Sequence, residues 1–219
     1  MLIQSLLAIA LTSAFIAGTR TLRESAKPGP DLARDARRTP WATAVLFVVI
    51  ATLSVIQILD PALLLLLCRD ASLIAAGEWW RLATSVLVQD GGVAGGSFNL
   101  LSLLLVGGVA EFLWGTRRWI CIVVVGVLLA QTVARTWQPN GAGNSMINFS
   151  LAGAVCIACL ARCQIRPALV AAFLALGAAG LLCLLRDIHG AAAACGAATG
   201  LVFIELDRYR QRQRLARQK

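Results

Sequence analysis

Six apolar runs dominate the pattern of hydrophobic and polar positions along this chain. Each run is about 17 to 19 residues long, and polar or charged residues separate one from the next. A helix needs roughly 20 predominantly apolar residues to cross the hydrocarbon core of a bilayer. The pattern therefore predicts six transmembrane helices, at residues 41–59, 97–114, 118–136, 145–161, 167–185 and 189–206.

Three other segments lie outside these six runs. Residues 1–18 are apolar but lack a positively charged start, which is atypical of a signal peptide. Two interpretations of this segment stay open, an extra span or an interfacial segment. Residues 19–40 are polar and contain proline, which indicates a flexible linker. The long connection 60–96 is apolar and holds Trp79 and Trp80, so we expect it to lie in the membrane interface.

Composition agrees with this pattern. The chain has 219 residues, of which 58% are hydrophobic and 14% charged, whereas soluble domains are about 45–50% apolar and about 25% charged. We therefore expect an all-α, polytopic membrane helical bundle. Its organisation would be an N-terminal apolar segment and linker at 1–40, a membrane domain at 41–206 and a basic tail at 207–219.

The charge distribution predicts an orientation. If the linker is cytoplasmic, sixteen of the 20 Lys and Arg residues fall in cytoplasmic segments, and only Arg69, Arg81, Arg135 and Arg186 fall outside. This asymmetry is typical of multi-pass membrane proteins and puts the C-terminus in the cytoplasm. No basic stretch is interleaved with aromatic residues, so we expect no nucleic-acid partner. Compactness and the absence of sorting motifs favour a bacterial plasma membrane.

Three polar residues fall at one depth on three spans that run in the same direction. Asn99, Ser145 and His189 each lie near the outer start of a span, and His189 is the only histidine of the chain. Neutral imidazole can take the proton of a serine hydroxyl, and an amide N–H can stabilise an oxyanion. We therefore predict a Ser–His dyad, with Asp187 left outside it because we expect it to be external.

Each of these residues also has a structural interpretation. A serine at a helix start is commonly a cap or a small packing residue, and Asn99 could form an interhelical hydrogen bond. A lone histidine at a membrane boundary is commonly an interfacial polar residue. The single histidine excludes a metal site with several histidine ligands.

A stripe of small residues follows His189. Ala192, Gly196 and Gly200 recur every four residues, a pattern by which membrane helices approach closely. The run that holds Ser145 offers Gly143, Ser150, Gly153 and Ala154. We therefore expect the serine and histidine helices to pack against each other.

These motifs resemble those of the rhomboid family of intramembrane serine proteases over residues 41–206. "EWWRLATS" resembles the Trp-Arg motif of the family's first loop, and "FNLLSLLLVGGVAEFLWG" its second span. "GNSM" stands at the nucleophile motif and "HGAAAACG" at the sixth-span motif. The residues that carry the resemblance are Trp80, Arg81, Asn99, Glu111, Gly143, Ser145, Phe149, His189 and Gly196.

The resemblance implies a six-helix core with a long external first loop and a water-filled cavity. It also implies cleavage of transmembrane protein substrates by a Ser145–His189 dyad, without metal or cofactor. Asn99 would support the oxyanion, and the Phe149 ring would lie against the catalytic histidine. Nothing in the pattern indicates an oligomeric state.

Two positions depart from the family's pattern. Gly95 stands where the family often has an oxyanion-binding histidine, and Met146 replaces a glycine after the nucleophile. Asn144, or Gln89 in the first loop, could replace the missing donor. These departures keep open a second hypothesis, a catalytically weak or silent rhomboid-like adaptor that binds transmembrane segments. An unrelated transporter is a third hypothesis, although the broken helices typical of transport are not evident.

Overall fold

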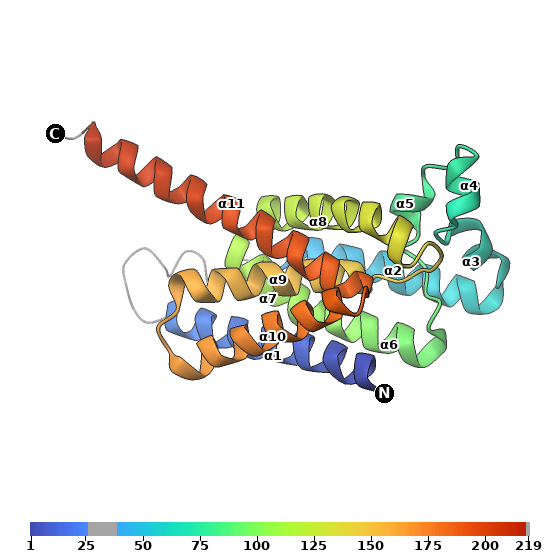
Figure 1. Cartoon of the computed structure of the whole chain (residues 1–219), viewed down its shortest axis with the longest axis horizontal. Helices are drawn as coiled ribbons and strands as arrows, with labels where there is room; N and C mark the ends of the chain where they lie inside the picture. The colour runs from blue at the N-terminus through green and yellow to red at the C-terminus, as the bar shows by residue number, and fades with distance from the viewer. Residues whose placement is uncertain (26–38, 218–219) are drawn as a thin grey trace.

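A computed structural model describes residues 1–25 and 39–217, and its regular elements are helices (Figure 1). In chain order they are α1 (Leu2–Ser25), α2 (Trp41–Leu59), α3 (Ala62–Leu67), α4 (Ala71–Ala75), α5 (Arg81–Thr84), α6 (Gly92–Ser102), the π-helical turn η2 (Leu103–Gly107), α7 (Gly108–Trp114), α8 (Thr116–Trp137), α9 (Ser145–Arg162), α10 (Arg166–Leu184) and α11 (Ile188–Ala216).

Seven helices within these ranges are long and apolar enough to cross a membrane. The six predicted spans are among them, and α1 is the seventh. Elements α6, η2 and α7 run on as one span, Gly92–Trp114, which begins five residues before the predicted start. The chain is therefore a multi-pass integral membrane protein with an all-helical fold.

Helix α1 is longer than the sequence pattern predicted. The linker was expected to start at residue 19, but the helix continues to Ser25. The hydroxyls of Thr19 and Thr21 bond to the carbonyls of Phe15 and Ala17 one turn back, so these polar side chains are satisfied inside the helix. Gly18 lies against Val109 and Val155 side chains, which makes α1 part of the bundle. Residues 26–38 of the predicted linker, with Lys27, Arg34, Arg37 and Arg38, lie outside the described residues, as does Lys219.

Helix α9 occupies the centre of the bundle. Every residue from Met146 to Cys159 is buried, and α9 packs against α1, α7, α8, α10 and α11. By contrast, only Thr43 and Ile50 are buried on α2, whose large apolar side chains face outward. A helix surrounded by protein can carry polar groups that would be expensive on a lipid-facing helix.

The closest helix contact joins α9 and α11. A Cβ atom added to Gly196 would collide with the Ser150 carbonyl, and one added to Gly153 would collide with the Ala193 carbonyl. The Ser150 hydroxyl donates to the Ala192 carbonyl at 3.1 Å. The predicted small-residue stripe is therefore the surface by which α11 meets α9.

The two ends of the bundle differ. Residues 60–91, including α3, α4 and α5, gather at the end where α9 and α11 begin, which we call the first-loop end (Figure 1). At the opposite end α11 projects beyond the other helices. The predicted basic tail at 207–219 is helical as far as Ala216, because α11 continues unbroken to that residue. Asp207 anchors it to α8 through an ion pair with Arg118 at 2.5 Å.

The α9–α11 contact generates a stability prediction. Gly196→Ala should lower the free energy of unfolding by about 1–3 kcal/mol, because the added methyl group forces two backbones apart. Thermal unfolding in detergent measures the effect. Gly180→Ala is the matched control, since a Cβ at this glycine of α10 meets no described atom within 4 Å. Equal melting temperatures for the two variants would contradict the proposed close contact.

Candidate active site

Ser145 is the first residue of α9, at the end of a loop that two glycines shape. Gly141 and Gly143 have φ values of 148° and 138°, which favour glycine. The Gly143 N–H donates to the Ser85 carbonyl at 2.8 Å, and Gly141 pairs with Arg69 through two backbone hydrogen bonds. The first loop therefore holds the backbone that presents Ser145. As a first-turn residue, Ser145 has a backbone N–H without an intrahelical acceptor.

His189 lies directly beside Ser145. It is the second residue of α11, and its Nε2 atom lies 2.9 Å from the Ser145 Oγ atom. With the proton on Nδ1, the neutral imidazole would accept the hydrogen bond of the Ser145 hydroxyl. The Phe149 ring, one turn into α9, packs against the imidazole with the ring centroids 4.9 Å apart and a tilt of 59°. The three residues thus come together from the first turns of two adjacent helices.

Asp187 joins this group, contrary to the expectation that it would be external. Its side chain is only 5% exposed, and its Oδ1 atom lies 2.5 Å from the His189 Nδ1 atom. The same oxygen accepts the backbone N–H of His189 at 2.9 Å and so caps α11. Asp before a helical run is a common N-cap, and this signal could have placed Asp187 at the helix start.

An amide network lies next to Ser145. Asn99 Nδ2 donates to Gln89 Oε1 at 3.0 Å, and Gln89 Nε2 donates to Asn144 Oδ1 at 2.7 Å. The carbonyl of Asn99 accepts from Asn144 Nδ2 and Asn148 Nδ2. Gln57 fixes the backbone of Gln89 through two further hydrogen bonds. The sequence pattern missed Asn148 and Gln57, although polar residues inside apolar spans are themselves a signal.

The network changes the assignment of the oxyanion donors. Asn144, one suggested donor, is fully buried, and its amide nitrogen donates to Asn99 O and Asn148 Oδ1. Gln89, the other suggestion, donates to Asn144. These hydrogen bonds use both N–H groups of the Asn144 amide and one of the two N–H groups of the Gln89 amide. Asn99 donates one N–H of its amide to Gln89 and keeps the second. A Cβ atom added to Gly143 would lie 3.4 Å from Asn99 Nδ2 and 3.6 Å from Ser145 Oγ. Gly143 thus leaves open the space between these two groups.

A cavity of about 580 Å³ opens beside these groups. Its lining includes Ser145, His189, Asn99, Gly95, Met146 and Arg69. A Cβ atom at Gly95 would meet no described atom within 4 Å, so the absence of a side chain there leaves space in the cavity wall. The cavity gives a ligand access to the serine hydroxyl.

Met146 packs on the side of the first loop. It is buried, and its sulfur lies 3.6 Å from Nη1 of Arg69, which is also buried. The guanidinium of Arg69 further donates to Gln131 Oε1 and to the Gln138 carbonyl, each at 2.8 Å. Arg69 and Gln131 were not predicted as site residues. They connect the first loop, α8 and the loop before Ser145.

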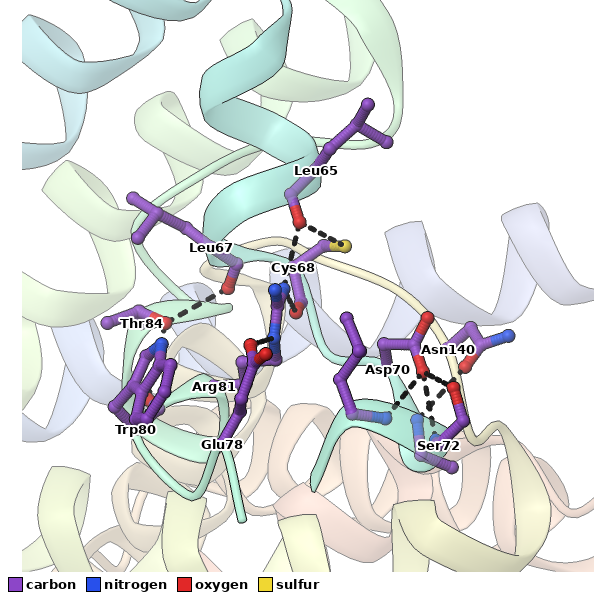
Figure 2. A network of polar contacts seen from close by, with 12 residues as sticks. Leu65, Leu67, Cys68, Asp70, Ser72, Glu78, Trp80, Arg81, Thr84 and Asn140 are labelled. Atoms are coloured by element: carbon purple, nitrogen blue, oxygen red, sulfur yellow. Dashed lines mark hydrogen bonds and ion pairs between the residues drawn. The ribbon is translucent and has the colours of Figure 1, made fainter. Parts of the chain in front are cut away.

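Arg81 organises the first loop, as Figure 2 shows. Its guanidinium donates to the carbonyls of Leu65 and Cys68 at 2.8 and 3.0 Å and pairs with Glu78 at 2.6 Å. Trp80 is half exposed and precedes Arg81 at the start of α5. Both residues lie in the loop, away from the serine hydroxyl.

Two other predicted residues lie deeper in the bundle. Glu111 accepts hydrogen bonds from the backbone N–H groups of Ala42 and Thr43 and from the Thr116 hydroxyl. A carboxylate at the N-terminus of α2 accepts from first-turn N–H groups that have no acceptor within the helix, and its negative charge is favourable at the positive end of the helix dipole. Gly196 lies two turns below His189 in the α9–α11 contact. These residues support the fold, and the structure does not bring them to Ser145.

Comparison with known proteins gives two matches. A family model described as the Rhomboid domain matches residues 76–210, which include Arg81, Asn99, Ser145 and His189. The rhomboid protease GluP of Bacillus subtilis (strain 168) is 34% identical over 88 residues. That match covers 40% of this chain and 17% of the length of GluP.

The contacts of Arg81 generate a second stability prediction. Arg81→Met should expose residues 60–91 to proteolysis, because the carbonyls of Leu65 and Cys68 and the carboxylate of Glu78 lose their partner. The loss should be about 1–3 kcal/mol for each buried group left unpaired. Limited proteolysis in detergent, followed by mass spectrometry, locates the cut. Arg135→Met is the matched control, because Arg135 is exposed at the end of α8. Cleavage in the first loop at the same rate in both variants would show that Arg81 does not hold the loop.

Proposed function

Because this chain belongs to the rhomboid family, we propose that it is an intramembrane serine endopeptidase that cleaves transmembrane-anchored proteins near the outer membrane face. The observation that carries this proposal is the 2.9 Å separation between Ser145 Oγ and His189 Nε2. This distance is within the hydrogen-bond reach that a nucleophile and its general base require.

The chemistry would proceed in two stages. His189 Nε2 takes the Ser145 proton while Oγ bonds to the carbonyl carbon of the scissile peptide. The second N–H of Asn99 and the backbone N–H of Ser145 donate to the oxyanion. The imidazolium then gives its proton to the leaving amine, and an acyl-enzyme forms. A water molecule repeats the sequence and releases Ser145, so each step uses only groups of this chain and water.

The shape of the site supports a peptide substrate delivered from the membrane. The cavity beside Ser145 is large enough for several side chains, and the nucleophile lies at the start of a membrane helix. Among the described residues, most Lys and Arg residues lie toward the opposite end of the bundle, at the ends of α1, α9 and α11 and the starts of α8 and α10. By the positive-inside rule the cavity then faces the outer side and the C-terminus is cytoplasmic. We expect the protein in a bacterial plasma membrane.

One observation favours a second function. Gly95 has no side chain that could donate to an oxyanion, and the space beside it is empty of described atoms. The amides of Gln89 and Asn144 already donate to Asn144 Oδ1 and to the Asn99 carbonyl, respectively. An enzyme with one oxyanion donor fewer is slower by roughly 10²–10³-fold. A silent rhomboid-like adaptor would bind transmembrane segments in the same cavity without cleaving them.

Substitution of either proposed catalytic residue separates these functions. Ser145→Ala and His189→Ala should each abolish cleavage of a transmembrane substrate in proteoliposomes. The first variant lacks the nucleophile and the second lacks the general base. A fluorophosphonate probe should label the wild type at Ser145 and neither variant. Ser54→Ala is the control, since among the described residues its hydroxyl bonds only to the Ile50 carbonyl of its own helix.

Two results would count against the protease. Cleavage that survives both substitutions would place the chemistry elsewhere. A wild-type protein that binds the substrate but neither cleaves it nor reacts with the probe would be an adaptor.

The role given to Asn99 generates a separate prediction. Asn99→Ala should lower kcat by roughly 10²-fold with a smaller change in KM, because an oxyanion donor acts in the transition state. Steady-state cleavage of the same substrate measures both constants. Asn140→Ala is the control, because this amide lines the same cavity. Within the part of the chain that the structure describes, its oxygen accepts only from the Ala71 N–H, at 3.3 Å. An equal loss of kcat in the two variants would remove Asn99 from the oxyanion site.

A further inference from the structure

Asp187 gives the Ser–His pair a third member. One oxygen of its buried carboxylate accepts the backbone N–H of His189 at 2.9 Å and lies 2.5 Å from the Nδ1 atom of the same residue. The opposite ring nitrogen, Nε2, lies 2.9 Å from Ser145 Oγ. The carboxylate, the imidazole and the hydroxyl are thus connected in series.

We infer that Asp187 is a positioning residue that holds His189 in the tautomer able to accept the Ser145 proton and stabilises the imidazolium formed during catalysis. This inference rests on the proposed function, and it extends the Ser–His dyad to a triad in which Asp187 transfers no proton. The proton moves from Ser145 to Nε2, while the Nδ1 proton stays on the imidazole.

The geometry restricts the imidazole from two sides. Because the Asp187 carboxylate also bonds the backbone of His189, its position relative to Nδ1 is fixed by the start of α11. The Phe149 ring covers the imidazole from α9. A rotation of the imidazole that removes Nε2 from Ser145 would therefore break the bond to Asp187 as well.

The surroundings keep the carboxylate charged. Burial alone would raise the pKa of the Asp187 carboxyl, but its hydrogen bonds and charge interaction with His189 outweigh this and lower the pKa overall. Other titratable groups nearby are Cys183 on α10, which interacts with Asp187, and Arg69 and Asp90, which line the cavity from the first loop. Arg69 and Asp90 carry opposite charges and interact with each other. The carboxylate of Asp187 is the charge in direct contact with the imidazole.

A purely structural role is the competing explanation, because Asp187 also caps α11. Asn and Ser are N-caps as good as Asp, so Asp187→Asn and Asp187→Ser keep the cap and remove the carboxylate. Asp70→Asn is the matched control, since Asp70 caps α4 through the N–H groups of Ser72 and Leu73 in the first loop. Thermal unfolding of all three variants checks that the cap is retained.

Kinetics of transmembrane-substrate cleavage provide the first test. Loss of the corresponding carboxylate in a soluble Ser–His–Asp protease lowers kcat by about 10⁴-fold, and we expect at least roughly 10²-fold here, with KM changed by less than about threefold. Asp70→Asn should leave both kcat and KM unchanged.

Nuclear magnetic resonance provides a test that does not depend on turnover. The chain has one histidine, so ¹⁵N-histidine labelling of a protein without a histidine tag reports a single imidazole. In the neutral wild type the proton should be on Nδ1, with its resonance shifted downfield by the bond to Asp187. Asp187→Ser should lose this shift, whereas Ser145→Ala should keep it and lose activity.

The outcomes distinguish the two proposals. Asp187→Ser and Asp187→Asn with wild-type kcat would overturn the positioning role and leave the protease intact. A wild-type imidazole protonated on Nε2 in its neutral form would overturn it even if the variants fail to fold. Cleavage that persists in Ser145→Ala would instead overturn the proposed function.

Discussion

The backbone contact between α9 and α11 is the constraint on which the rest of the site depends. Gly153 and Gly196 let the two helices approach until a methyl group would collide with the opposite carbonyl. Ser145 and His189 lie in the first turns of these helices, which start at the same end of the bundle. In a membrane, packing of small residues is a main source of helix association, since lipid already solvates the apolar faces. One contact therefore stabilises the bundle and sets the distance between hydroxyl and imidazole.

The polar groups around this contact are paired with one another. Lipid cannot satisfy a hydrogen-bonding group, so each polar side chain at membrane depth needs a protein partner or a water-filled space. Gln89, Asn99, Asn144 and Asn148 form one network. Arg69 donates to Gln131 and to the Gln138 carbonyl through its two terminal nitrogens, whereas its buried Nε atom has no hydrogen-bond partner among the described residues. Both networks include a residue from the first loop. The loop is thus a structural part of the site, because it holds in place the irregular backbone before Ser145.

The sequence predicted the spans and the shared level of Asn99, Ser145 and His189, because span direction and depth follow from hydrophobic periodicity and length. It did not predict the continuation of α1 to Ser25 or of α11 to Ala216, since polar residues were taken as the ends of helices. Asp187 was missed for a related reason. A charged residue beside a span was expected to face water, whereas its capping of α11 turns the carboxylate inward to the imidazole. Which amides pair with which depends on tertiary distances that spacing alone does not encode.

The two departures from the family pattern act on different physical quantities. Met146 affects packing, and the flexible, polarisable thioether fills the space beside Arg69. The Ser145–His189 distance of 2.9 Å is compatible with that packing. Gly95 affects electrostatic stabilisation, and among the described residues the nearby amides of Gln89 and Asn144 are already committed to the network. The alignment of hydroxyl and imidazole is in place without a ligand, so this chain departs from the family pattern in its oxyanion donors rather than in the Ser145–His189 contact.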